Sequence, residues 1–342
     1  MRMKTLTRNA EYCAGNARLR KRCGFTLVEL LTVITIIGML GAISITTVRG
    51  AVQSARETQT RTTVAKIDNV LTGIYEKYQY RRVEIPNVIG GRKPNVMERA
   101  YMRVLTLRAL LRCDMPCTRQ ELVATPFYYD GHPDNYVFTP LQEAYNREVT
   151  IALNNGAAPS LPNINAELLY LVVMNADPEA RAVFSEREVA DTDNNGLFEF
   201  VDGWGNPIRW MRWAPGLVDS DRQPACYAGV VTISDPNTNR VAREDVDPFD
   251  PLEVIQRAYD VDVTGDIAPP EQPGWFLVPY VYSVGPDGEA GLVTPEDIEA
   301  EADNASFMND PFTYSRNNPN ATAGSPDGPF YKDNIDNHTL VR

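Results

Sequence analysis

A twelve-residue segment, from Asp191 to Asp202, carries oxygen-bearing side chains at the spacing of a calcium-binding loop. The donors at positions one, three, five, nine and twelve are Asp191, Asp193, Asn195, Glu199 and Asp202. Gly196 stands at position six, where such loops turn sharply. Two features depart from the pattern, since Asp202 is shorter than the usual Glu and a turn, not a helix, follows it. The segment therefore predicts either a calcium site or an Asx-rich turn.

Cys113 and Cys117 lie close together at the end of a predicted helix. In an oxidising compartment these two residues can form a disulfide, although the spacing is equally compatible with free thiols. The chain has only two histidines, His132 and His338, and neither clusters with the cysteines. A zinc site is therefore not expected.

No nucleophile, base and acid occur together in a pattern that predicts catalysis. Both histidines lie in turn-like segments, and their simplest interpretation is as surface residues. The cluster of Trp204, Trp210 and Trp213 is more typical of a hydrophobic core than of a ligand platform. We therefore expect a protein that is not an enzyme.

The segment 25–45 is apolar for 21 residues and holds one charged residue, Glu29. A helix of this length, at about 1.5 Å per residue, can span a bilayer. A lone carboxylate in hydrocarbon is unfavourable unless it is paired or neutralised. Residues 1–24 hold seven basic side chains and one acidic side chain, whereas the rest of the chain holds 26 basic and 44 acidic ones. This asymmetry predicts a basic end kept in the cytoplasm and an exported acidic body.

Two ordinary interpretations of this N-terminus leave features unexplained. A secretory signal has a shorter apolar core without an acid, although the segment 52–55 would serve as its cleavage site. A plain membrane anchor explains the length and the orientation but not Glu29.

A resemblance to a known family is carried by the run Arg20-Lys21-Arg22-Cys23-Gly24-Phe25-Thr26-Leu27-Val28-Glu29-Leu30-Leu31. This run resembles the class III leader of type IV pilins and type II secretion pseudopilins. The resemblance implies that a prepilin peptidase cuts after Gly24, that Phe25 is then N-methylated, and that Glu29 pairs with the N-terminal ammonium of a neighbouring subunit. Opposite charges in a low-dielectric helix bundle can neutralise each other. The leader of 24 residues is long for this family.

Two short elements further along resemble the major, G-type pseudopilins. The segment 202–207 is similar to their D-x-W-G-x-P element, and the segment 283–288 is similar to their S-x-G-x-D-G turn. Because that family binds one calcium ion between late strands, the resemblance makes Asp287, Glu289 and Asp333 candidate ligands. The segment 291–330 is longer than in the family. As a whole the arrangement is similar to large pseudopilin-like proteins of planctomycete-type bacteria.

The expected fold is α+β, with a long helix packed on a head that contains a small antiparallel sheet and extra helices. The helix continues to about Tyr80, because apolar residues recur at spacings of three and four: Val64, Ile67, Leu71, Ile74 and Tyr78.

The expected divisions are a leader (1–24), an apolar half-helix (25–47), an amphipathic half-helix (48–80), a helical insertion (81–190) and a loop-rich β head (191–342). Further helices are predicted at 97–112, 166–175 and 178–190, and strands at 207–213, 227–233 and 275–284.

These features predict a structural subunit, a pseudopilin of a type II secretion pseudopilus. It would cross the bacterial inner membrane once, with its N-terminus cytoplasmic and its head periplasmic before assembly. Its expected partners are other pseudopilins, the prepilin peptidase that also methylates, and the inner-membrane assembly platform. A net charge of −12 argues against nucleic-acid binding. Two alternatives remain, namely a type IV pilin for adhesion or DNA uptake and a membrane-tethered calcium-binding ectodomain.

Overall fold

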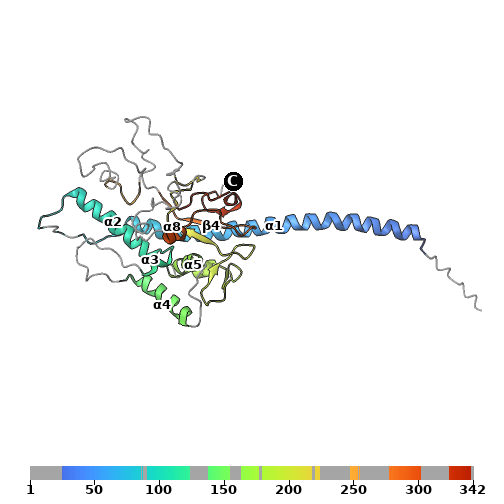
Figure 1. Cartoon of the computed structure of the whole chain (residues 1–342), viewed down its shortest axis with the longest axis horizontal. Coiled ribbons are helices and arrows are strands. Elements are labelled where there is room, and N and C mark those ends of the chain that lie inside the picture. Colours follow the sequence, from blue (N-terminus) through green and yellow to red (C-terminus); the bar gives the residue numbers. More distant parts are fainter. Residues whose placement is uncertain are drawn as a thin grey trace, which may run out of the picture. The chain divides into compact units, whose positions relative to one another are not determined.

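The computed structural model describes residues 25–85, 87, 91–123, 138–154, 163–176, 179–217, 220–223, 247–252, 254, 277–301 and 323–339. The chain divides into two compact units, Met1–Val52 and Gln53–Arg342. One helix, α1 (Leu27–Gln79), belongs to the first unit over its first half and to the second unit over its second half (Figure 1). The predicted long helix, ending near Tyr80, is therefore confirmed.

In the first unit, the large apolar side chains of α1 are exposed. Leu27 is 80% exposed, Ile37 is 62% exposed and Ile43 is 64% exposed. The most apolar 18-residue window of α1 has a mean hydropathy of 2.2, and none of it is buried within the protein. By length and composition this helix can cross a membrane, and it suggests a single membrane anchor.

In the second unit, α1 buries the face that its apolar spacing predicts. Val64, Ile67 and Leu71 have no exposed surface, and they belong to the main hydrophobic core. Two charged residues in this half of α1 also have partners in other segments. Lys66 pairs with Glu188 at 2.9 Å, and Asp68 accepts a hydrogen bond from Arg222 at 2.6 Å. Other segments therefore cover more of this helix than one apolar face.

Six further helices are described in this unit, and all of them except α8 contribute residues to that core. The prediction at 97–112 corresponds to α2 (Val96–Asp114), which begins with a capping box between Asn95 and Glu98. The prediction at 166–175 corresponds to α5 (Ile164–Ala176). Only α6 (Ala180–Val183) falls within the helix predicted at 178–190. The other helices are α3 (Arg119–Val123), α4 (Pro140–Asn154) and the late α8 (Pro295–Glu301).

Two small antiparallel sheets complete the α+β fold. One pairs β1 (Val189–Ala190) with β2 (Glu199–Phe200). The other has the order β3-β4-β5, formed by β3 (Arg209–Met211), β4 (Tyr280–Ser283) and β5 (Ile335–Asp336), which follows the 3₁₀ helix η3 (Phe330–Asp333). Two of the predicted strand segments contain β3 and β4, whereas 227–233 lies outside the described residues.

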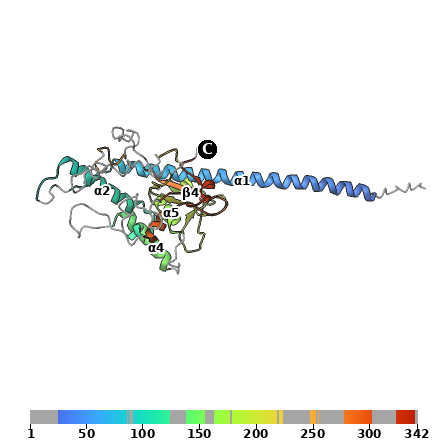
Figure 2. The same ribbon diagram turned by 45° about the horizontal axis from the view of Figure 1, so that its top comes forward.

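The three-stranded sheet is packed close to α1. In Figure 2, β4 lies between the second half of α1 and α5, and α4 lies beyond α5. The hydroxyl of Tyr75 on α1 donates to the carbonyl of Leu277, just before β4, at 2.6 Å. The side chain of Asn337, just after β5, donates to Asp68 at 2.8 Å. Residues from both the 81–190 and the 191–342 segments contribute to the main core with α1.

The disulfide considered for Cys113 and Cys117 is not formed in the structure, where both side chains are buried thiols. The thiol of Cys117 points to Glu121 instead, donating to its Oε2 at 3.4 Å. Burial raises the pKa of Cys113 to about 11 and that of Cys117 well above its usual range. Both groups therefore stay protonated at neutral pH, a state in which thiols are unreactive.

His338 was expected at the surface, but the structure buries it with 1% exposed. The residue follows β5, and its ring packs edge-on against Tyr280 with centroids 5.2 Å apart. Its Nε2 lies 3.2 Å from the carbonyl oxygen of Pro279, and its Nδ1 lies 2.7 Å from the hydroxyl of Ser220. A carbonyl only accepts, so Nε2 donates and Nδ1 accepts from Ser220. The neutral ring is therefore fully hydrogen-bonded.

Lowering the pH from about 6.5 to about 4 is expected to destabilise the protein through His338. Burial lowers the pKa of this ring to about 4, from an ordinary value of 6.5. Over that range His338 binds a proton in the unfolded chain but not in the folded chain, so its own contribution to the free energy of unfolding falls by about 3 kcal/mol. The measurement is chemical unfolding of the full-length protein in detergent. His338→Gln should flatten this pH dependence and His132→Gln should not, and equal slopes in all three proteins would refute the assignment.

Candidate functional site

The first turn of α1 is closed by a capping box between Thr26 and Glu29. The backbone N–H of Thr26 donates to Glu29 Oε2 at 2.8 Å, and its hydroxyl donates to the same oxygen at 2.9 Å. In return the N–H of Glu29 donates to the Thr26 hydroxyl oxygen at 3.2 Å. Such reciprocal bonds satisfy donors that a helix start leaves unpaired. The T-x-x-E spacing of Thr26 and Glu29 is a sequence signal for this capping box, which was not predicted from the sequence.

The carboxylate of Glu29 remains exposed and carries an unneutralised charge within the described part of the chain. It takes part in none of the ion pairs found among those residues. Phe25 is also exposed, whereas Gly24 lies outside the described residues. The acid is therefore accessible at the start of an exposed apolar helix.

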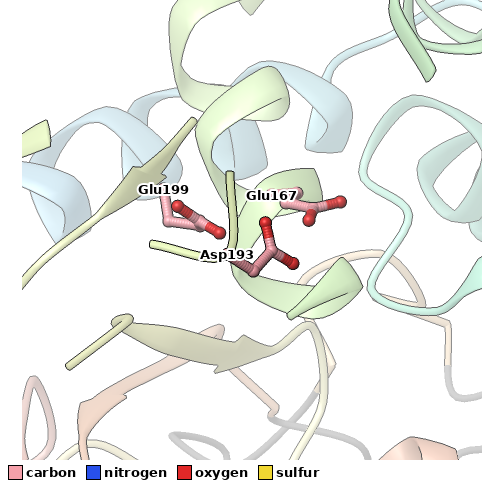
Figure 3. A group of neighbouring side chains, drawn as sticks. All are labelled: Glu167, Asp193 and Glu199. Carbon is pink, nitrogen blue, oxygen red and sulfur yellow. The ribbon is translucent and has the colours of Figure 1, made fainter. Parts of the chain in front are cut away.

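A second candidate site is a group of three carboxylates from three different elements. They belong to Glu167 in the first turn of α5, Asp193 in the loop between β1 and β2, and Glu199 in β2. One ligand oxygen from each lies within 4.8 Å of the others (Figure 3). Among the described residues, this is the one such group of three or more Asp, Glu, His or Cys side chains.

The loop holds its shape with the residues of the calcium-loop pattern. The carboxylate of Asp191 accepts from the N–H groups of Asn195 and Gly196, both at 3.0 Å. Gly196 has a φ of 92°, a left-handed conformation that favours glycine. The side-chain amide of Asn195 donates to Glu167 at 2.6 Å and to Asp193 at 3.0 Å. The loop therefore turns Asp193 and Asn195 toward α5.

Asp202, the twelfth position of the pattern, does not join this group. Its Oδ1 accepts from the N–H groups of Trp204 and Asn206, both at 2.8 Å. Its Oδ2 accepts from the hydroxyl of Ser283 at 2.7 Å. The loop is followed by strand β2 and not by a helix. Asp202 therefore lies in the turn after this strand, away from the loop. The third carboxylate of the group belongs to Glu167.

Glu167 escaped the sequence analysis because it precedes the loop by more than twenty residues. Its one sequence signal is that it is the single acidic residue in the apolar helix Ile164–Ala176. The side chains of Glu167 and Glu199 are both completely buried. Burial, together with the negative charges of neighbouring carboxylates, raises the pKa of each to about 7. The cluster therefore holds more negative charge than its surroundings neutralise.

The other predicted ligands lie in turns around β4 and β5. Asp287 accepts the N–H of Glu289 at 2.9 Å. Partial burial, and secondarily the charge of Asp287, raises the pKa of Asp333. Asp287, Glu289 and Asp333 do not form a three-ligand group as close as the Glu167 cluster among the described residues.

The two pseudopilin-like elements of the head bind one another. Besides the bond from Ser283 to Asp202, the side chain of Asn206 donates to the carbonyl of Gly285 at 2.8 Å. The segments 202–207 and 283–288 therefore form one interlocked pair of turns.

The first of these turns also packs on the second half of α1. The N–H of Gly203 donates to the hydroxyl of Thr60 at 2.9 Å. A Cβ at position 203 would lie 2.6 Å from the carbonyl oxygen of Arg56, so this close approach requires glycine. The indole N–H of Trp204 donates to Gln53 at 3.3 Å. The turn thus anchors the sheet region to the helix.

A family model described as the prokaryotic N-terminal methylation motif matches residues 19–45. The match contains Gly24, Phe25 and Glu29, and it implies processing by a prepilin peptidase and assembly into pilus-like filaments. No curated protein and no solved structure matches the chain. Together with the exposed apolar helix α1, this match shows a prepilin-type N-terminal motif at the start of a helix that can cross a membrane, and it supports a type IV pilin-like protein.

Proposed function

We propose that the chain is a pseudopilin, a structural subunit of a type II secretion pseudopilus. The subunit is anchored in the inner membrane by the first half of α1 after the leader is removed. The assembly platform then moves it into a filament, whose growth pushes cargo toward the outer membrane. The observation that carries this proposal is the methylation motif at the start of an exposed apolar helix.

The chemistry of α1 supports a helix that packs against copies of itself or related subunits. An exposed apolar surface along the whole first half is unfavourable in water and is satisfied by lipid or by other apolar helices. Glu29 is unfavourable in lipid alone. A bundle of processed subunits removes both problems, because each new N-terminus at Phe25 supplies an ammonium group for a neighbouring Glu29.

The head supports the type II assignment over other pilus-like filaments. The elements that resemble D-x-W-G-x-P and S-x-G-x-D-G are joined by the hydrogen bonds of Asp202 and Asn206. Gly203 is required where this pair of turns contacts α1. These residue choices therefore have a shared structural purpose, which favours a pseudopilin-like head over a chance match of short motifs.

Mass spectrometry of the protein from its native membrane tests the processing step. We expect a mature chain that begins at Phe25 and carries one methyl group on its α-amine. In Gly24→Leu the leader should remain attached, because the peptidase needs a small residue at the cut. A wild-type N-terminus near Ala55 would indicate an ordinary secretory signal, and an intact basic leader would indicate a plain anchor, and either result refutes the proposal.

A further inference from the structure

We propose that the head binds a divalent metal cation, best matched by calcium, through four side chains: Glu167, Asp193, Asn195 and Glu199. The site joins helix α5, the loop after β1 and strand β2 within one unit. It does not depend on the filament function, and it differs from the late turns that hold Asp287 and Asp333.

The environment of Glu167 favours a bound cation. This side chain has no exposed surface, so water cannot solvate its carboxylate. One oxygen, Oε1, accepts from Asn195, whereas Oε2 has no hydrogen-bond partner. An unpartnered carboxylate oxygen in a buried position is strongly unfavourable. A cation bound at the cluster would stabilise this buried carboxylate.

The negative charge of the group also favours a bound cation. Three carboxylates lie within 4.8 Å of one another, and none of them takes part in an ion pair among the described residues. In the view of Figure 3 the carboxylate of Asp193 lies between those of Glu199 and Glu167. Like charges at this distance repel each other in a low-dielectric interior. A divalent cation would turn that repulsion into attraction.

The position of the Asn195 side chain also favours a bound cation. Its NH₂ group donates to Glu167 and to Asp193, so two N–H dipoles bridge the carboxylates. The NH₂ group is the positive end of the amide dipole, and it lies where a cation would be most stable. Rotating the amide by half a turn would present its oxygen as a ligand, at the cost of the bond that this oxygen accepts from Leu197 N–H at 2.8 Å.

The identity of the cation follows from the donor set. All four side chains offer oxygen, and no cysteine or histidine belongs to the cluster. Oxygen ligands favour hard cations. Calcium has ligand distances of about 2.3–2.6 Å, so two ligands of one ion can be up to about 5 Å apart. The observed limit of 4.8 Å meets that requirement.

Calcium titration of the full-length protein in detergent tests the site. After removal of metal with a chelator, isothermal titration with calcium chloride should show one site with a dissociation constant of about 1 mM or below. Calcium should also raise the thermal unfolding midpoint, because the folded state alone assembles the ligands. Glu167→Gln keeps the size and one acceptor oxygen, and it should weaken binding by about 10-fold or more.

Three comparisons make the result decisive. Glu186→Gln is the same chemical change at an exposed residue, and it should bind calcium as the wild type does. Asp193→Asn is a second ligand variant, and it should also weaken binding. Because Asp193 is not buried, this variant tests the site even if Glu167→Gln fails to fold. Asp287→Asn should leave binding unchanged. The proposal is refuted if the wild type does not respond at about 10 mM calcium, if both ligand variants bind normally, or if Asp287→Asn alone abolishes binding.

Discussion

Replacing Arg212 with Met is expected to lower the free energy of unfolding by about 3–5 kcal/mol, because it leaves a buried carboxylate without its cation. Arg212 is 1% exposed, and its partner Glu121 has no exposed surface. The guanidinium donates to both carboxylate oxygens of Glu121, and it also donates to the carbonyl of Met115 at 2.8 Å. Glu121 also accepts from the N–H and the thiol of Cys117, which carry no positive charge.

Chemical unfolding of the full-length protein in detergent measures this effect. The double variant Arg212→Met/Glu121→Leu should regain most of the lost stability, since apolar residues of similar volume often replace a buried ion pair without loss. Arg92→Met is the matched control, because Arg92 pairs with Glu98 on the surface, and it should unfold almost as the wild type does. If Arg212→Met were no less stable than Arg92→Met, the Glu121–Arg212 pair would not be an important core contact.

The long helix could be predicted from the sequence because its signal is local. Residues such as Ile67 and Leu71 recur at the helical period, and the same spacing fixes which face is buried. The N-terminal methylation motif could be recognised for a similar reason, since the residues around Gly24 and Glu29 form one continuous pattern. Local periodicity and contiguous motifs do not require knowledge of the tertiary fold.

The acidic cluster could be predicted only in part. Asp193, Asn195 and Glu199 are close in sequence, so a spacing rule brought them together. Glu167 belongs to a helix that precedes the loop, and its role depends on how α5 packs against β2. Such a contact between distant segments leaves no spacing pattern in a single sequence.

Buried polar residues of the head were missed for the same reason. The surroundings of His338 resemble a surface turn in sequence, but the pairing of β4 with β5 places the ring beside Pro279 and Tyr280. The ion pair of Arg212 with Glu121 joins two segments about ninety residues apart. Tertiary packing decides whether a polar side chain is solvated or buried, and local composition does not record it.

Replacing Glu29 with Gln is expected to reduce the incorporation of the subunit into filaments by about 10-fold or more, while cleavage after Gly24 continues. In the proposed bundle, the carboxylate of one subunit neutralises the N-terminal ammonium of another. A glutamine removes that charge but retains an oxygen that accepts hydrogen bonds from Thr26, so the capping box at the start of α1 can still form. The expected loss is therefore specific to pairing between subunits.

Thr26→Ala provides the matched control, because it removes the cap and leaves the charge of Glu29 in place. Subunits in the filament and membrane fractions of cells expressing each variant at equal levels can be compared by immunoblotting, together with the export of secreted proteins. We expect Thr26→Ala to assemble and support secretion nearly as the wild type does, and Glu29→Gln to fail in both. The reverse result would show that Glu29 acts mainly as a helix cap, and normal assembly of both variants would leave the exposed apolar surface of α1 as the main source of subunit cohesion.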